Sequence, residues 1–213
     1  MRNWLKGDAE DLRETERLEA FSDGVIAIAI TLLVLEIRVP EIEEATPDAL
    51  WQALRSLWPN YLGYVISFAT IGIMWANHHL IFRYIDRTDH YLMLTNLLFL
   101  FFVAAVPFPT ALMAEYLGHP AERVGIIVYS GWFLLTALSY NLLWRYASTG
   151  NRLVAPTANA AAVRAITSRF NLGPPSYAVA FVLAFFSTAA SLVVLLGLAL
   201  AYVLPYRGRT DAD

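Results

Sequence analysis

Charged residues are separated along this chain by long apolar stretches, and this pattern predicts membrane-spanning helices. The segments Pro59–Phe82, Tyr91–Ala114 and Val124–Trp144 contain no Lys, Arg, Asp or Glu. A bilayer core about 30 Å thick is crossed by about 20 helical residues, so each segment predicts one span. A fourth charge-free segment, Phe170–Tyr206, has 37 residues and is too long for a single span.

We interpret this fourth segment as a helical hairpin. Its first helix would start in the small-residue run from Ala160 and bend at Gly173-Pro174-Pro175, and the turn would lie near Ser187–Ala189. One long, tilted helix is the alternative interpretation. The complete prediction is an all-α membrane protein with one domain, residues 1–213, and six spans at about 18–38, 58–80, 90–110, 123–145, 165–186 and 188–205.

The first predicted span is the exception to this pattern, because its charge-free stretch is short. Phe21–Ile37 is helix-length only if Asp23 lies inside it and Glu36 at its end, because the charge-free part, Gly24–Leu35, has 12 residues. A buried helix of a soluble protein would have the same pattern. With five other spans in the chain, we expect a membrane helix that carries functional polar groups.

Composition agrees with a membrane location. Of the 213 residues, 58% are hydrophobic and 15% are charged, whereas soluble proteins average about 45–50% and about 25%. The mean hydropathy is +0.50. The net charge of −3 leaves no basic footprint for nucleic acid, and the absence of Cys excludes disulfides and thiolate metal sites.

The basic residues predict the orientation, since Lys and Arg concentrate in cytoplasmic loops. With six spans and a cytoplasmic N-terminus, 12 of the 15 basic residues are cytoplasmic, and the exceptions are Arg38, Arg55 and Arg123. Five spans would place the last two arginines outside. We therefore expect both termini in the cytoplasm.

Asp23 is the carboxylate placed inside a span, where an ionisable group is costly and points to function. We expect Ser22 and Asp23 to join a buried polar network with groups at the same depth. A helix-capping role is the alternative, and the two are compatible. The candidate partners are Asn77, His78, His79 and Asn96.

Beyond Asp23, four side chains share one face of the helix. Ile28, Thr31, Leu32 and Leu35 follow the spacing i, i+3, i+4, i+7. By pattern alone this is an ordinary packing face, with Thr31 bonded to its own helix.

Several longer motifs occur along nearly the whole chain. They are Arg17-x-x-x-Phe21-Ser22-Asp23-Gly24-Val25-x-Ala27-Ile28-x-x-Thr31-Leu32-Leu33-x-Leu35-Glu36-Ile37, Trp75-x-x-His78-His79, Asn96-Leu97-x-Phe99-Leu100, Pro107-Phe108-Pro109-Thr110-x-Leu112, Gly173-Pro174 and Tyr202-x-x-Pro205. Together these motifs resemble the lysosomal potassium channel (transmembrane protein 175) family in its single-repeat prokaryotic form.

The resemblance implies a homotetramer in the prokaryotic plasma membrane, with four copies of the first helix around a central cation pore. Ile28, Leu32 and Leu35 would form apolar rings that impede ions, as dewetted gates do. Thr31 hydroxyls would meet potassium ions transiently and favour them weakly over sodium. Partners would be membrane lipids and further copies of the chain, with no cofactor beyond permeant potassium and no small-molecule substrate. A structural role is implied for Arg17, Phe21, Ser22 and Asp23.

Two rival functions belong to other classes. In a proton-coupled secondary transporter, Asp23 with His78 or His79 would be a proton relay, but inverted repeats and paired broken helices are missing from the sequence. In an intramembrane enzyme the same histidines would be catalytic. Adjacent histidines point to different helix faces, which is poor spacing for metal ligands, so we expect no enzyme.

Overall fold

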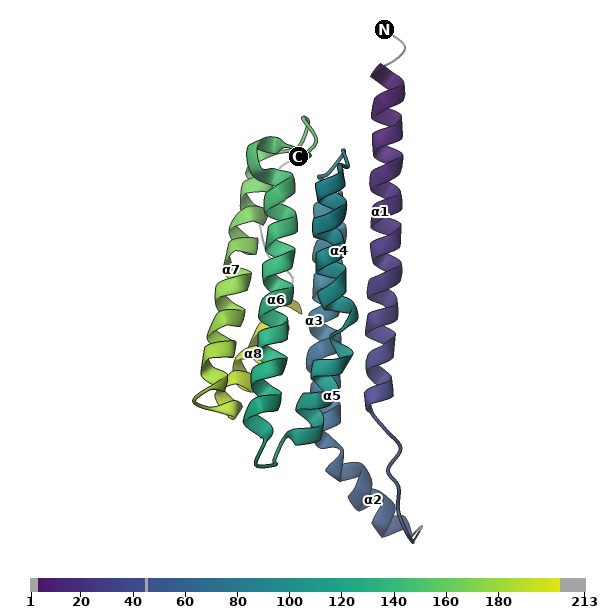
Figure 1. Ribbon diagram of the computed structural model, residues 1–213, viewed down its shortest axis with the longest axis vertical. Helices are drawn as coiled ribbons and strands as arrows, with labels where there is room; N and C mark the ends of the chain where they lie inside the picture. Colours follow the sequence, from purple (N-terminus) through teal and green to yellow (C-terminus); the bar gives the residue numbers. More distant parts are fainter. Residues whose placement is uncertain (1–3, 45, 204–213) are drawn as a thin grey trace, which may run out of the picture.

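The computed structural model describes residues 4–44 and 46–203, and its regular elements within this part of the chain are all helical. Figure 1 shows the long helices side by side, with α1 at one edge and α7 at the opposite edge. The elements are α1 (Trp4–Leu32), the 3-10 helix η1 (Leu33–Glu36), α2 (Pro47–Ser56), α3 (Trp58–Phe82), α4 (His90–Ala104), α5 (Pro107–Tyr116), α6 (Glu122–Ser148), the 3-10 helix η2 (Thr149–Asn151), α7 (Ala160–Ala184) and α8 (Thr188–Val203).

Local side chains determine where several helices begin. Thr46 caps α2 by accepting a hydrogen bond from the Ala49 N–H at 3.2 Å, and Asp89 caps α4 by accepting one from the Leu92 N–H at 2.8 Å. Asn159 caps α7. Short oxygen-bearing side chains satisfy N–H groups that have no partner in the first helical turn.

Four stretches of the described chain are long and apolar enough to cross a bilayer. They are Arg13–Glu36, Trp58–Phe82, His90–Tyr116 and Glu122–Asn151. The predicted C-terminal hairpin corresponds to α7 and α8, which pack together. Their turn is at residues 185–187, slightly earlier than predicted, and the end of the last predicted span lies outside the described residues.

The third predicted span, 90–110, is not one continuous helix. It consists of α4 and α5, separated at Ala105–Val106. Pro107 has no N–H to continue the helical ladder. The Val106 N–H turns to the Val103 carbonyl at 3.1 Å, and the Phe102 carbonyl accepts a bond from the Trp132 indole at 2.8 Å instead. The break is therefore stabilised by α6.

The core lies between α3, α4, α6 and α7 and is rich in aromatic rings. Tyr140 packs against Phe99 with ring centroids 4.5 Å apart and against Phe170 at 4.8 Å. Glycine permits close packing elsewhere, because a Cβ on Gly125 would lie 3.2 Å from the Leu112 carbonyl oxygen. Small residues of this kind let membrane helices approach closely.

Helix α1 packs on α3 and α4 at the edge of this core. In the most apolar 18-residue part of its span, 22% is buried inside the protomer, against 44%, 44% and 50% for the other three spans. Much of the apolar surface of α1 is therefore left uncovered by its own chain.

Candidate functional site

Three buried polar side chains connect α1, α4 and α3 in one directed chain of hydrogen bonds. The Ser22 hydroxyl donates to the Leu18 carbonyl at 2.8 Å, and the Asn96 amide donates to the Ser22 oxygen at 2.8 Å. The Asn96 oxygen then meets His78 Nε2 at 3.0 Å.

The Leu18 carbonyl at one end determines which group donates in each of these hydrogen bonds. A carbonyl only accepts, so Ser22 donates to Leu18 and must accept from the Asn96 amide. The Asn96 oxygen consequently faces His78, which carries its proton on Nε2. The His78 ring is fully buried and stacks on Phe82 with centroids 4.4 Å apart. Ser22, Asn96 and His78, which we call the α1 anchor, hold α1 to the core.

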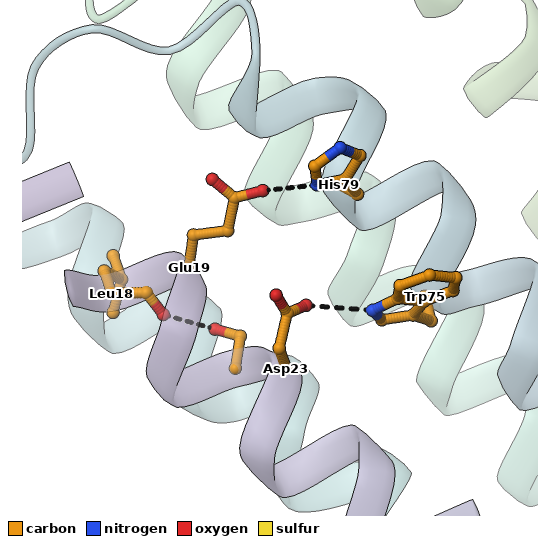
Figure 2. Close-up of polar contacts among 6 residues, drawn as sticks. Leu18, Glu19, Asp23, Trp75 and His79 are labelled. Carbon is orange, nitrogen blue, oxygen red and sulfur yellow. Dashed lines mark hydrogen bonds and ion pairs between the residues drawn. The ribbon is translucent and has the colours of Figure 1, made fainter. Parts of the chain in front are cut away.

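Two further contacts join α1 to α3 at its more exposed side, as Figure 2 shows. Glu19 meets His79 Nδ1 at 2.8 Å, and the Trp75 indole donates to an Asp23 carboxylate oxygen at 2.9 Å. Glu19 and Asp23 are four residues apart, as are Trp75 and His79. Because α1 and α3 run in opposite directions, the two pairs match in reverse order.

This arrangement differs in two ways from the sequence expectation of a single network. Asp23 is not part of the buried chain, since it contacts Trp75 on another side of α1. The assignment of Asn77 was wrong: its amide donates to the Ile73 carbonyl of its own helix at 3.0 Å. The helix turns Asn77 toward a separate hollow lined by Tyr140 and Arg169.

Sequence reasoning missed Glu19 as a partner and treated Trp75 only as a motif and interfacial residue. The matched spacings of Glu19 with Asp23 and of Trp75 with His79 were the available signal. Arg17 and Phe21 are exposed in the protomer.

The C-terminal half of the α1 span presents an exposed apolar stripe. Ile28, Leu32 and Leu35 are 62%, 41% and 65% exposed. Ile26 and Leu33, on the opposite face, are buried. The last part of the stripe lies in η1, where tight 3-10 winding places residues three apart on the same side, so Leu32 and Leu35 follow one another along the axis.

Thr31 lies within this stripe and is exposed. Its hydroxyl donates to the Ile28 carbonyl at 2.9 Å. The hydroxyl proton is thereby directed into the helix, which leaves the oxygen lone pairs available to a cation. Among the described residues, no cluster of three or more His, Cys, Asp or Glu side chains could hold a metal ion.

The fold and this site together define a helical membrane protein whose first helix is anchored at one half and apolar and uncovered at the other. Residues 17–107 match the family model described as endosomal/lysosomal potassium channel TMEM175. A potassium channel of Chamaesiphon minutus is 50% identical over 197 residues, covering 92% of this chain and 97% of that protein. A potassium channel of Streptomyces collinus is 47% identical over 192 residues, or 90% and 92% of the two chains.

A solved structure agrees with these matches. The crystal structure of a lysosomal potassium-selective channel TMEM175 homolog from Chamaesiphon minutus superposes with a TM-score of 0.82 at 49% identity, covering 90% of this chain and 97% of that one. The chain belongs to the TMEM175 potassium channel family. This family consists of ion channels.

Proposed function

We propose that this chain is one subunit of a homotetrameric potassium channel, weakly selective over sodium, in which α1 lines the central pathway. The uncovered apolar stripe of α1 carries the proposal. Within this stripe, Ile28 and Leu35 are the most exposed apolar side chains. The protomer has a large apolar core, but these two side chains are not packed into it. Full-length relatives named as potassium channels at 47% and 50% identity support the same function.

In this proposal, Ile28, Leu32 and Leu35 from four subunits form successive apolar rings. A narrow apolar constriction resists wetting, so a hydrated ion passes it slowly. Widening of the rings by a tilt of α1 would admit water and increase conduction. The α1 anchor limits that tilt, because it bonds the opposite half of the helix to α3 and α4.

Thr31 gives the constriction its polar element. Four hydroxyl oxygens at one level can replace part of the hydration shell of a weakly hydrated cation. Potassium gives up its water more readily than sodium, so a ring of this kind favours potassium modestly. Because the hydroxyl protons are bonded to the Ile28 carbonyl, the oxygens face the pathway as acceptors.

Both termini are proposed to lie in the cytoplasm of a prokaryotic cell, following the distribution of basic residues. The segment that joins α1 to α3 then faces outward. It carries Glu36, Glu41, Glu43, Glu44 and Asp48 against Arg38 and Arg55. This acidic surface would be repeated by symmetry at the outer mouth and would concentrate cations.

Current recording from the purified protein in a planar bilayer tests the proposal directly. With potassium on one side and sodium on the other, we expect a steady current whose reversal potential indicates a preference for potassium. Absence of current, or flux that requires a counter-substrate, would favour a coupled transporter instead. Asp23 accepts from Trp75, whereas His78 meets Asn96 and His79 meets Glu19, so the recorded hydrogen bonds do not join Asp23 to either histidine of the proposed proton relay.

A further inference from the structure

A polar hollow of about 560 Å³ lies between the end of α6, the loop after η2 and the first turns of α7. Hydroxyl and amide groups make up much of its wall, and one arginine lines it. One part of the wall is apolar, with Val154, Pro156 and Val163. The polar lining residues that matter here are Thr149, Asn151, Arg164, Thr167, Ser168 and Asn171, and we call this site the α6–α7 hollow.

The charge around this hollow is positive. From residue 145 to residue 169 the chain contains four arginines and no Asp or Glu. Arg164 lines the hollow, and Arg145 donates to Asn171 on its wall at 2.9 Å. Arg152 lies over the Tyr146 ring, 4.8 Å from its centroid.

Two carboxylates lie on the segment before α4, and the one that contacts α6, Asp89, already accepts hydrogen bonds. The Tyr146 hydroxyl donates to Asp89 at 2.6 Å, and the other Asp89 oxygen caps α4. Asp86 lies 3.7 Å from the Arg87 guanidinium. An anion in the hollow would therefore meet arginine and neutral donors without a competing acid in the wall.

Hydrogen bonds between α6 and α7 fix the wall of the hollow. The Trp144 indole donates to Thr167 at 2.9 Å, and Thr167 in turn donates to the Val163 carbonyl at 2.8 Å. These bonds join α6 to α7 directly beneath the polar wall. The site is thus shaped by packed helices rather than by one surface loop.

Its place in the fold indicates the source of the ligand. The hollow lies where the span Glu122–Asn151 ends, which is the depth of lipid headgroups. Figure 1 shows α6 and α7 on the side of the molecule away from α1. With α1 at the pore, this side faces lipid.

We propose that the α6–α7 hollow binds the phosphate-ester headgroup of an anionic membrane lipid. Arg164 and Arg145 attract the phosphate, the hydroxyl and amide groups bond its oxygens, and the apolar wall receives the start of an acyl chain. Basic pockets between helices at the cytoplasmic boundary are suited to such headgroups. The lipid-facing position and the cytoplasmic boundary rest on the proposed function, but lipid retention and current are measured separately, so failure of one proposal is distinguishable from failure of the other.

Native mass spectrometry of the intact protein with phosphatidylglycerol and with phosphatidylcholine tests the proposal. We expect retained phosphatidylglycerol on the wild type and weaker retention in Arg164→Gln and Arg145→Gln, by about fivefold for each, since one arginine near a lipid surface is worth about 1 kcal/mol. Arg123→Gln, at the opposite end of α6, is the matched control and should bind as the wild type does.

Two outcomes would overturn the assignment. One is equal retention of both lipids by the wild type, and the other is undiminished phosphatidylglycerol binding by the Arg164→Gln, Arg145→Gln double variant. Soluble glycerol 3-phosphate separates the sources of phosphate, because a headgroup site should not lose lipid to it at equal concentration. Displacement of the lipid would instead assign the hollow to a free phosphate ester. Circular dichroism of each variant verifies that it is folded.

Discussion

The two halves of the first span are built differently. From Thr15 to Asp23, α1 makes side-chain bonds to α3, to α4 and to the loop between them, including the Thr15–Thr88 contact at 2.7 Å. From Ile28 to Glu36, the recorded bond to another described helix is the one that the Asn60 amide of α3 donates to the Glu36 backbone carbonyl at 2.9 Å, and the Thr31 hydroxyl bonds only within α1. One half determines where the helix stands, and the other half is left free for an environment outside the protomer.

The comparison shows how a helix can be fixed to its own protomer by hydrogen bonds and still keep one apolar face exposed. Burial of apolar surface is non-directional, so it would not by itself decide which face of the apolar half of α1 turns toward the core. Directional bonds at Ser22, Glu19 and Asp23 fix the rotation of α1 about its axis. That rotation turns Ile26 and Leu33 into the core and Ile28 and Leu35 away from it.

Among the polar contacts of α1, removal of the α1 anchor should have the largest effect on stability. Asn96→Leu leaves the His78 Nε2–H buried without an acceptor and removes the bond to Ser22. We expect a loss of about 2 kcal/mol of stability, since an unsatisfied buried group costs about 1–3 kcal/mol. Thermal unfolding in detergent measures the loss.

Thr95→Val is the control for this change, because Thr95 bonds only to the Tyr91 and Leu92 carbonyls of its own helix. An Asn96→Leu protein as stable as Thr95→Val would refute the role of the anchor.

Shortening the exposed apolar side chains of α1 should widen the proposed pathway and change conduction, with little effect on stability. In the Ile28→Ala, Leu32→Ala double variant, smaller side chains would weaken the dewetted barrier. A rise in potassium current of roughly tenfold is expected, which corresponds to a barrier lowered by about 1.4 kcal/mol. Single-channel recording measures it.

Leu33→Ala provides the contrast on the buried face of the same helix. It should lose about 2–5 kcal/mol of stability, as large-to-small core changes do. Unchanged current in the double variant, or increased current in Leu33→Ala alone, would show that the exposed stripe does not form the constriction.

Thr31→Ala should reduce selectivity while conduction persists. One hydroxyl contact is worth about 1 kcal/mol, so the potassium-to-sodium permeability ratio should fall toward unity, by at most about fivefold. The reversal potential under bi-ionic conditions gives this ratio. Thr31→Ser keeps the hydroxyl and should retain the ratio, and a loss of selectivity there equal to that in Thr31→Ala would contradict the assignment.

The smallest effect is expected at the exposed contacts with α3. Trp75→Phe retains an aromatic ring but removes the indole N–H that donates to Asp23. Polar contacts between membrane helices average about 0.6 kcal/mol, so a similar loss of stability should appear in the unfolding midpoint. A loss as large as that of Asn96→Leu would show that both sides of α1 anchor it equally.

The depth of each polar side chain in the membrane could be predicted from the sequence, but the rotation of each helix about its own axis could not. Ser22, Asn96 and His78 lie at one depth when the charge-free segments are aligned, and these three groups do meet. Asn77 lies at the same depth and turns away, because one residue along a helix rotates a side chain by about 100°. Glu19 was given no partner, since the His79 side chain that contacts it on α3 is far away in the sequence.

The order of residues is enough to predict an all-helical membrane protein of the TMEM175 potassium channel family, since the bilayer requires long apolar segments and the first helix carries a long specific motif. The packed helices were needed to show which side chains form the anchor, that the third span breaks at Ala105–Val106, and which face of α1 stays uncovered. Those features depend on helix rotation and on partners such as Trp132, and packing between distant segments sets both.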